Sequence, residues 1–199
     1  MAVNDHSAPE HLDGDEPLYW HTPELYGEAE ALNIMGTIAA PLLGGFSLAS
    51  MVLTVTITTS ETRWPDAALL LFMLAAVLFV ATVQIMFMAR RYQASPPDLK
   101  AWWPDADQPQ RMKQLQNEQK RHAAGFRRWS GRALVTYRLA LLSLQAALTI
   151  LAVPAESHGQ ASVLRWLAVA VGGAAFTAQA VWLIGNFISP KRMARLLEP

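Results

Sequence analysis

Polar side chains inside long apolar stretches are the residues of this chain with the clearest capacity for chemistry. Arg138 is an ionisable group within the apolar run 133–153, and Gln145 lies further along the same run. Ionisable groups at membrane depth commonly mark ion or substrate pathways. Arg138 can alternatively extend its guanidinium to the polar interface and anchor the helix, so both interpretations stay open. We expect the Gln145 amide to bond a neighbouring helix.

The residue types that most membrane catalysts and proton carriers need are missing from the apolar runs. These runs contain no Asp, Glu or His, and the chain has no cysteine. Proton relays, carboxylate filters and bis-His haem sites are therefore not expected. The 5 histidines lie outside the runs without metal-ligand spacing, and no nucleophile elbow, phosphate loop or HExxH motif is present. We predict no enzyme activity, no metal, no cofactor and no nucleic-acid partner.

Four apolar runs position these side chains. They cover residues 32–59, 67–89, 133–153 and 163–188. As helix, each can cross a hydrocarbon core, which needs about 20 residues. The sequence predicts an all-α, polytopic integral membrane protein with four transmembrane helices and a cytoplasmic helical extension before the third span. We divide it into a disordered acidic tail (1–22), a transmembrane domain (23–189) that includes a cytoplasmic loop and helix (90–132), and a short basic cytoplasmic tail (190–199).

The basic residues of the chain lie mostly on one side of the runs. Segment 90–132 contains Arg90, Arg91, Lys100, Arg111, Lys113, Lys120, Arg121, Arg127, Arg128 and Arg132. The C-terminal tail adds three more, whereas the other two connections carry only Arg63 and Arg165. Loops rich in Lys and Arg stay in the cytoplasm. We therefore expect a multi-pass protein of the cell membrane with cytoplasmic N- and C-termini.

The basic segment has several interpretations. Its candidate contact residues are Arg90, Arg91, Lys120, Arg121, Arg127 and Arg128. They can bind anionic lipid, a cytoplasmic or membrane protein partner, or the N-terminal residues 1–31, which carry eight acids and no Lys or Arg. They can also serve only to set topology. Within this segment, four prolines between residues 95 and 110 predict an irregular linker.

Residues 110–129 of the same segment have apolar side chains at three- and four-residue spacings, which indicates an amphipathic helix. This apolar stripe packs on the protein's own helices, lies on the membrane surface or pairs between subunits. We expect the helix to continue into the third span.

Small residues gather in the first and fourth runs. Gly36, Ala40 and Gly44 recur every four residues, with Gly45 beside them, and Gly172 and Gly173 lie in the fourth run. Such spacing lets helix backbones approach closely. The contacts are either within one bundle or between subunits around an axis. Pro41, in the first run, predicts a kink there.

Residues 42–53 read Leu-Leu-Gly-Gly-Phe-Ser-Leu-Ala-Ser-Met-Val-Leu. This stretch resembles the first, pore-lining helix of Orai-type calcium channels. The resemblance implies four spans, cytoplasmic termini and assembly around a central pore formed by the first helix. The filter carboxylate of that family would fall on Leu53, and an acidic stretch replaces the basic one before its pore. Calcium selectivity is therefore not implied.

If the first helix lines a pore, the side chains that face it are apolar. They are Leu42, Phe46, Ala49 and Leu53, at spacings of four, three and four residues. A constriction of this kind gates by dewetting. We therefore predict a homo-oligomeric pore or ion channel, regulated through the cytoplasmic helix.

The alternative function is a non-conducting accessory or scaffold subunit of a larger membrane complex. It is motivated by the 110–129 helix and by the lack of a charged path through the runs. A small transporter comes third, because only Pro41 and the Gly172-Gly173 pair suggest broken helices.

Overall fold

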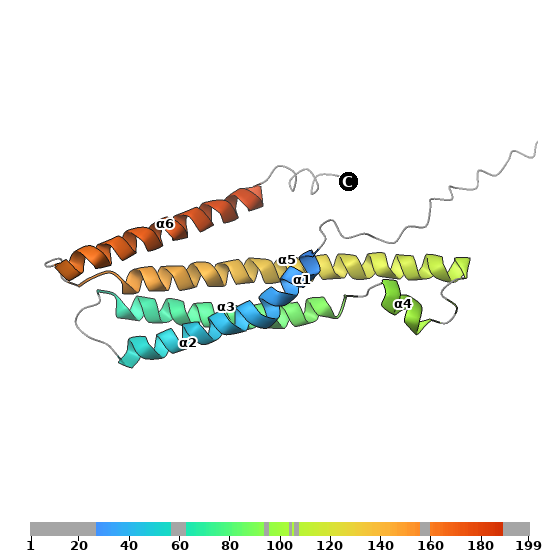
Figure 1. The fold of residues 1–199 in the computed structure, drawn as a ribbon, viewed down its shortest axis with the longest axis horizontal. Helices are drawn as coiled ribbons and strands as arrows, with labels where there is room; N and C mark the ends of the chain where they lie inside the picture. Colours follow the sequence, from blue (N-terminus) through green and yellow to red (C-terminus); the bar gives the residue numbers. More distant parts are fainter. Residues whose placement is uncertain are drawn as a thin grey trace, which may run out of the picture.

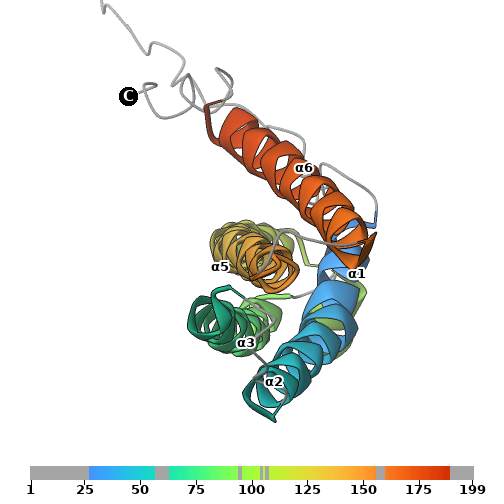
Figure 2. The same cartoon turned by 90° about the vertical axis from the view of Figure 1, so that its left-hand side faces the viewer.

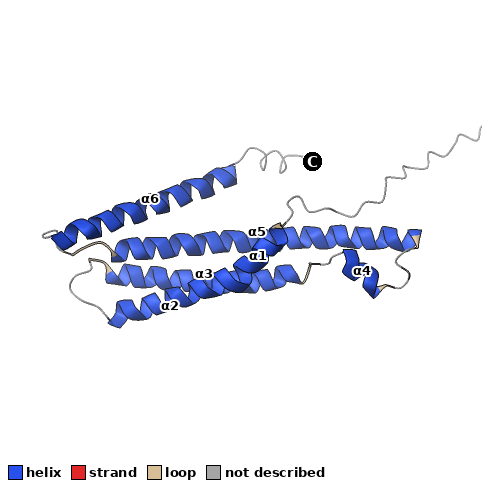
Figure 3. Cartoon of the chain, in the orientation of Figure 1, coloured by secondary structure: helices blue, strands red, loops and turns tan. Residues whose placement is uncertain are grey.

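The computed structural model describes residues 27–56, 63–93, 96–103, 105, 108–155 and 160–188. All regular elements within these ranges are helices (Figure 3). In chain order they are α1 (Glu28–Ile34), η1 (Met35–Ala39), α2 (Ala40–Thr56), α3 (Pro65–Arg90), α4 (Pro96–Trp102), α5 (Pro109–Leu151) and α6 (Gln160–Ile188). Four stretches are long and apolar enough to cross a membrane: 28–56, 65–90, 109–151 and 163–185. The all-helical architecture with four candidate spans is thus confirmed. The predicted tails, 1–22 and 190–199, lie outside the described residues.

Helices α3 and α5 lie side by side along the long axis and share the most extensive interface (Figures 1 and 2). Phe72 and Phe79 of α3 are fully buried in this interface, together with Ala140 and Ala147 of α5. The Phe79 ring meets Tyr137 edge-on, with centroids 5.8 Å apart and an interplanar angle of 68°, which is a favoured aromatic geometry. Large rings facing alanines let the two helices pack at close range.

Helices α1, η1 and α2 follow one another without a break and cross α3 obliquely (Figure 1). The π-helical turn η1 ends just before Pro41, and the Ala40 N–H bonds the Met35 carbonyl. Proline lacks the N–H that the Thr37 carbonyl would receive in a regular helix, and a π turn is one way to accommodate such a defect. The expected kink is therefore a π turn, and the helix begins at Glu28, four residues before the apolar run.

Segment 95–110 differs from the expected irregular linker because it contains the short helix α4. Pro96 and Pro97 occupy its first turn, where a missing N–H costs no intrahelical bond. Leu99 of α4 is 5 % exposed and Leu115 of α5 is 1 % exposed. The prolines therefore start a helix here rather than prevent one, and the burial of Leu99 holds it in place.

Helix α5 runs for 43 residues without interruption, which is about 64 Å at 1.5 Å per residue. A bilayer core is about 30 Å thick, so α5 is roughly twice as long as one membrane crossing requires. Residues 109–132, most of which extend beyond the end of α3 (Figure 1), are called the basic arm from here on. The helix passes through Gly125, where the Tyr92 ring packs so closely that a Cβ would lie 2.8 Å from its Cδ1 atom.

Helix α6 runs antiparallel to α5 and diverges from it toward the C-terminal end of α6 (Figures 1 and 2). Most of its described side chains are exposed, and among them only Leu183 is buried. The described chain is therefore a packed three-helix unit with a fourth helix that touches it along one side.

Candidate functional surfaces

Helix α2 and the preceding π turn pack on α3 through their small residues. Gly36, Ala40 and Gly44 are all buried. A Cβ atom at Gly36 would lie 2.8 Å from Cβ of Met86, and one at Gly44 would lie 3.3 Å from Cβ of Phe79. These small residues therefore let the first helix approach α3 closely within one chain.

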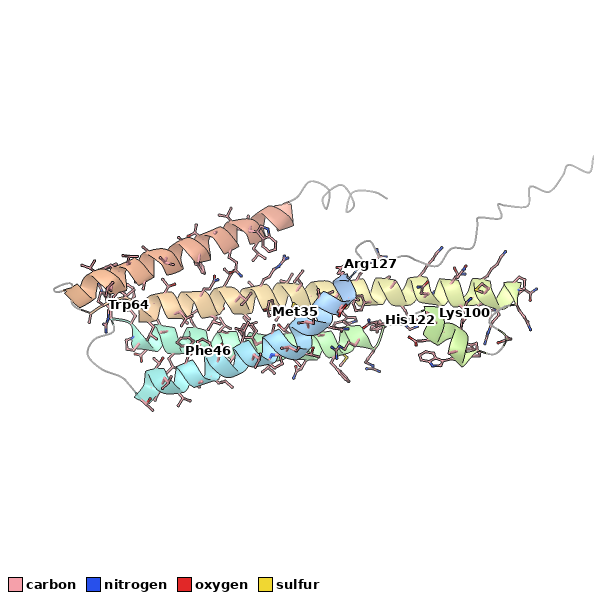
Figure 4. The ribbon with its side chains drawn as sticks, viewed as in Figure 1. Met35, Phe46, Trp64, Lys100, His122 and Arg127 are labelled. Atoms are coloured by element: carbon pink, nitrogen blue, oxygen red, sulfur yellow. The ribbon has the colours of Figure 1, made fainter. Side chains whose placement is uncertain are left out.

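The opposite side of α2 carries the four residues expected to line a pore. Leu42, Phe46 and Leu53 are 69, 50 and 56 % exposed, and Ala49 is also exposed. Gly45 lies among them, and a Cβ there would meet nothing within 4 Å. We call these five residues the α2 open face (Phe46 is labelled in Figure 4). It combines large apolar side chains with small residues, and no other described helix covers it.

Hydroxyl groups on α2 bond the backbone of their own helix. Ser47 donates to the Leu43 carbonyl at 2.8 Å, and Thr54 donates to the Ser50 carbonyl at 2.8 Å. This back-bonding is the usual way to satisfy Ser and Thr inside an apolar helix. Both residues are buried, so the two hydroxyls lie on the packed side, and the α2 open face is apolar along its length.

Arg138 lies between α5 and α6. Its guanidinium carbon is 4.4 Å from the centre of the Trp182 ring, a cation–π distance. The two helices also meet at Gly172, where a Cβ would lie 2.5 Å from Oγ1 of Thr149, whereas a Cβ at Gly173 would meet nothing within 4 Å. Trp182 was not identified from the sequence, although the antiparallel order of the last two spans places it opposite Arg138.

Gln145 also lies in the α5 segment that approaches α6. Its side-chain oxygen is buried and has no hydrogen-bond partner among the described residues. Its backbone carbonyl accepts a bond of 2.8 Å from the Thr149 hydroxyl. A buried acceptor without a donor costs about 1–3 kcal/mol, so a donor brought close to this oxygen would be stabilising.

Arg90 and Arg91 lie where the apolar part of α3 ends. Arg90 donates from Nε to Oδ1 of Asn33 at 2.9 Å, and Nη1 of Arg91 lies 3.9 Å from Sδ of Met88. The first contact ties the end of α3 to α1. Arg90 therefore has a structural bond within the chain, which sequence reasoning did not identify because Asn33 is 57 positions away.

The other predicted contact residues lie along the basic arm. Lys120, Arg121, Arg127 and Arg128 are all exposed, and Figure 4 labels Arg127 beside the crossing of α1 and α5. They lie opposite a buried side that includes Leu115. The apolar stripe of this helix thus packs on the protein's own elements, and its charged side is open.

Aromatic side chains also contact the basic arm near its N-terminal end. The Arg111 guanidinium carbon lies 3.8 Å from the centre of the Trp103 ring, and Arg111 Nε is 3.7 Å from Oδ1 of Asp105. Trp102 is 68 % exposed. Farther along, the His122 and Tyr92 rings are 6.1 Å apart. These contacts hold the α3–α5 connection against the arm.

No group of three or more His, Cys, Asp or Glu side chains within the described ranges could hold a metal ion. No protein-family model, curated protein or solved structure matches the chain. The resemblance of residues 42–53 to Orai-type channels therefore stays a prediction.

Proposed function

We propose that the protein is a homo-oligomeric membrane pore or ion channel whose constriction is formed by the α2 open face. The observation that carries this proposal is the division of α2 into two sides. Gly36 and Gly44 are used against α3 of the same chain, whereas Leu42, Phe46 and Leu53 are at least half exposed. Copies arranged around an axis would bring these apolar side chains together.

The composition of the α2 open face favours a second copy as its cover. Gly45 and Ala49 alternate with Leu42 and Phe46 on this surface. Small residues next to large ones let a neighbouring helix approach closely and interlock. A surface that only contacts lipid tails has no need of such small residues. A ring of Phe46 and Leu53 side chains would close the path by excluding water.

The proposal places the protein in the cell membrane with both termini in the cytoplasm. Four candidate spans support the multi-pass arrangement. The side that carries the basic arm would be cytoplasmic because Lys and Arg accumulate there. The arm is then the part of the channel that cytoplasmic signals can reach, and we propose that it regulates opening.

Cross-linking at the α2 open face tests this assembly. The chain contains no cysteine, so Phe46→Cys introduces a single thiol per subunit. In native membranes we expect a short thiol-to-thiol cross-linker to join Phe46→Cys subunits to one another. Val80→Cys is the matched control, because Val80 is 53 % exposed but lies on α3. Equal yields at the two positions, or no product at Phe46→Cys, would contradict the proposed axis.

A second candidate function is a non-conducting accessory or scaffold subunit. The observation that favours it is the long basic arm together with α4, which presents Trp102 at 68 % exposure. Exposed tryptophan and arginine are typical of protein-binding surfaces. In this case the protein would hold a cytoplasmic or membrane partner, and the α2 open face would contact that partner or lipid.

A further inference from the structure

Four exposed, positively charged long side chains lie on one side of the basic arm. Lys113, Lys120, Arg121 and Arg128 are exposed, and their positions along a helix of 3.6 residues per turn place them on one side. The opposite side holds the buried Leu115. Lys113 and Arg128, at the two ends of the row, are 15 positions apart, or about 22 Å along the axis.

These four basic residues have no partner within the described part of the chain. None of them makes a hydrogen bond, ion pair or ring contact there. The ion pair in this region, Arg111 to Asp105, involves a different residue. An anionic segment laid along this row would be stabilising, because it would form several ion pairs together.

The chain itself brings an acidic segment to this place. Leu32 of α1 packs in one cluster with Ala133 of α5, and Phe126 and Trp129 pack against that cluster. The first helix therefore begins beside the membrane end of the basic arm, where Figure 4 shows Arg127 next to the start of α1. Gly27, to which the preceding residues are covalently joined, therefore lies near this end of the arm.

The residues before Gly27 carry charge opposite to that of the basic row, and they are long enough to reach along it. Residues 1–26 contain Asp5, Glu10, Asp13, Asp15, Glu16 and Glu24, and no Lys or Arg. The acids from Glu10 to Glu16 are 11 to 17 residues from Gly27. A random coil of 11 to 17 residues has an average end-to-end distance of about 18–23 Å, which is close to the length of the basic row.

We infer that the acidic N-terminal segment docks on the basic row Lys113, Lys120, Arg121 and Arg128 of its own chain. Each exposed ion pair contributes little, but several act together, and the covalent link keeps the segment at a high effective concentration. Docking masks the row, and release makes the row available to other anionic partners. The inference does not depend on whether the protein conducts.

Anionic lipid is the other chemistry that could neutralise this row, and the geometry disfavours it. Arg121 and Lys113 are 12 and 20 residues before residue 133, where the apolar run begins. Along a continuous helix, these separations are about 18 and 30 Å. The Debye length at physiological salt is about 8 Å. Most of the row is therefore beyond the reach of headgroup charge when α5 is upright.

Distances between two spin labels test the docking directly. Gly14→Cys places one label among the acids, and Ala124→Cys places the other on the exposed side of the arm. The full-length protein is studied in neutral-lipid nanodiscs, diluted with unlabelled protein so that distances within one chain are measured. At low salt we expect the two labels to lie close together in most molecules. At high salt, screening weakens the ion pairs, and the ratio of molecules with a short label-to-label distance to those with a long one should fall about tenfold.

Charge reversal separates docking from a non-specific salt effect. Lys113→Glu/Lys120→Glu/Arg128→Glu should abolish the short distance, and so should Asp13→Lys/Asp15→Lys/Glu16→Lys. Combining the two sets should restore it, because opposite charges face each other again. The inference is overturned if salt leaves the distances unchanged, if the combined variant does not regain the short distance, or if that distance requires anionic lipid in the nanodisc.

Discussion

Replacing Phe46 with serine is expected to raise the leak conductance of bilayers containing the purified protein by at least about tenfold. Phe46 is half exposed on the α2 open face, and in the proposed assembly every subunit contributes one such ring to the constriction. Removing a large apolar side chain changes its transfer free energy by about 1.5–3 kcal/mol, and each 1.4 kcal/mol off a barrier is about tenfold in rate. Serine hydrates the constriction, so water and ions enter more readily.

The matched control is Val80→Ser, which makes a similar polar change at an exposed site of α3. It should leave the conductance unchanged. Leu53→Ser, seven residues further along the same surface, should behave like Phe46→Ser. Unchanged currents in both the Phe46 and Leu53 variants would remove the pore assignment and leave the scaffold as the better proposal.

Gly36→Val is expected to destabilise the fold more than any other single change at the described glycines of the first helix. The new Cβ would lie 2.8 Å from both Cβ and Cγ of Met86. The Met86 Cβ is fixed to the α3 backbone, so it moves only if α3 moves. Overpacking of this kind costs about 1–3 kcal/mol, and the two extra methyl groups of valine place this variant at the upper end. Titration with a denaturing detergent measures the loss.

Gly45→Val is the control for that experiment. It introduces the same side chain into the same helix, and a Cβ there meets nothing within 4 Å. The folding free energy of this variant should therefore stay within about 0.5 kcal/mol of the wild type, while assembly through the α2 open face should weaken. Equal destabilisation at the two glycines would contradict the packing described for α1, η1, α2 and α3.

The helices themselves could be predicted because their signal is local. Each apolar run is long enough to determine a helix without knowledge of its neighbours, and the described chain is all-helical as expected. Helix α4 was missed because the prolines of segment 95–110 suggest a loop, whereas the buried Leu99 supplies a tertiary reason for a helix. The burial of Leu99 depends on the rest of the fold and is not visible in seven residues of sequence.

The sequence did not predict which side of each helix packs against which neighbour. A glycine every four residues predicts close packing, but it does not tell which neighbour is packed. In the structure Gly36 and Gly44 face α3, whereas a Cβ added at Gly45 or Gly173 would meet nothing within 4 Å. Arg138 could be identified as unusual from its apolar surroundings, but its contact with Trp182 depends on how the antiparallel helices α5 and α6 are placed.

The subunit count and symmetry of the purified protein test the central proposal most directly. Native mass spectrometry gives the count, and two-dimensional image averages show where the first helix lies. We predict a closed ring of several identical subunits with α2 nearest the axis, because the uncovered apolar side of that helix would meet there. A monomer, or a dimer without a central axis, would contradict the pore and direct attention to a partner of the basic arm.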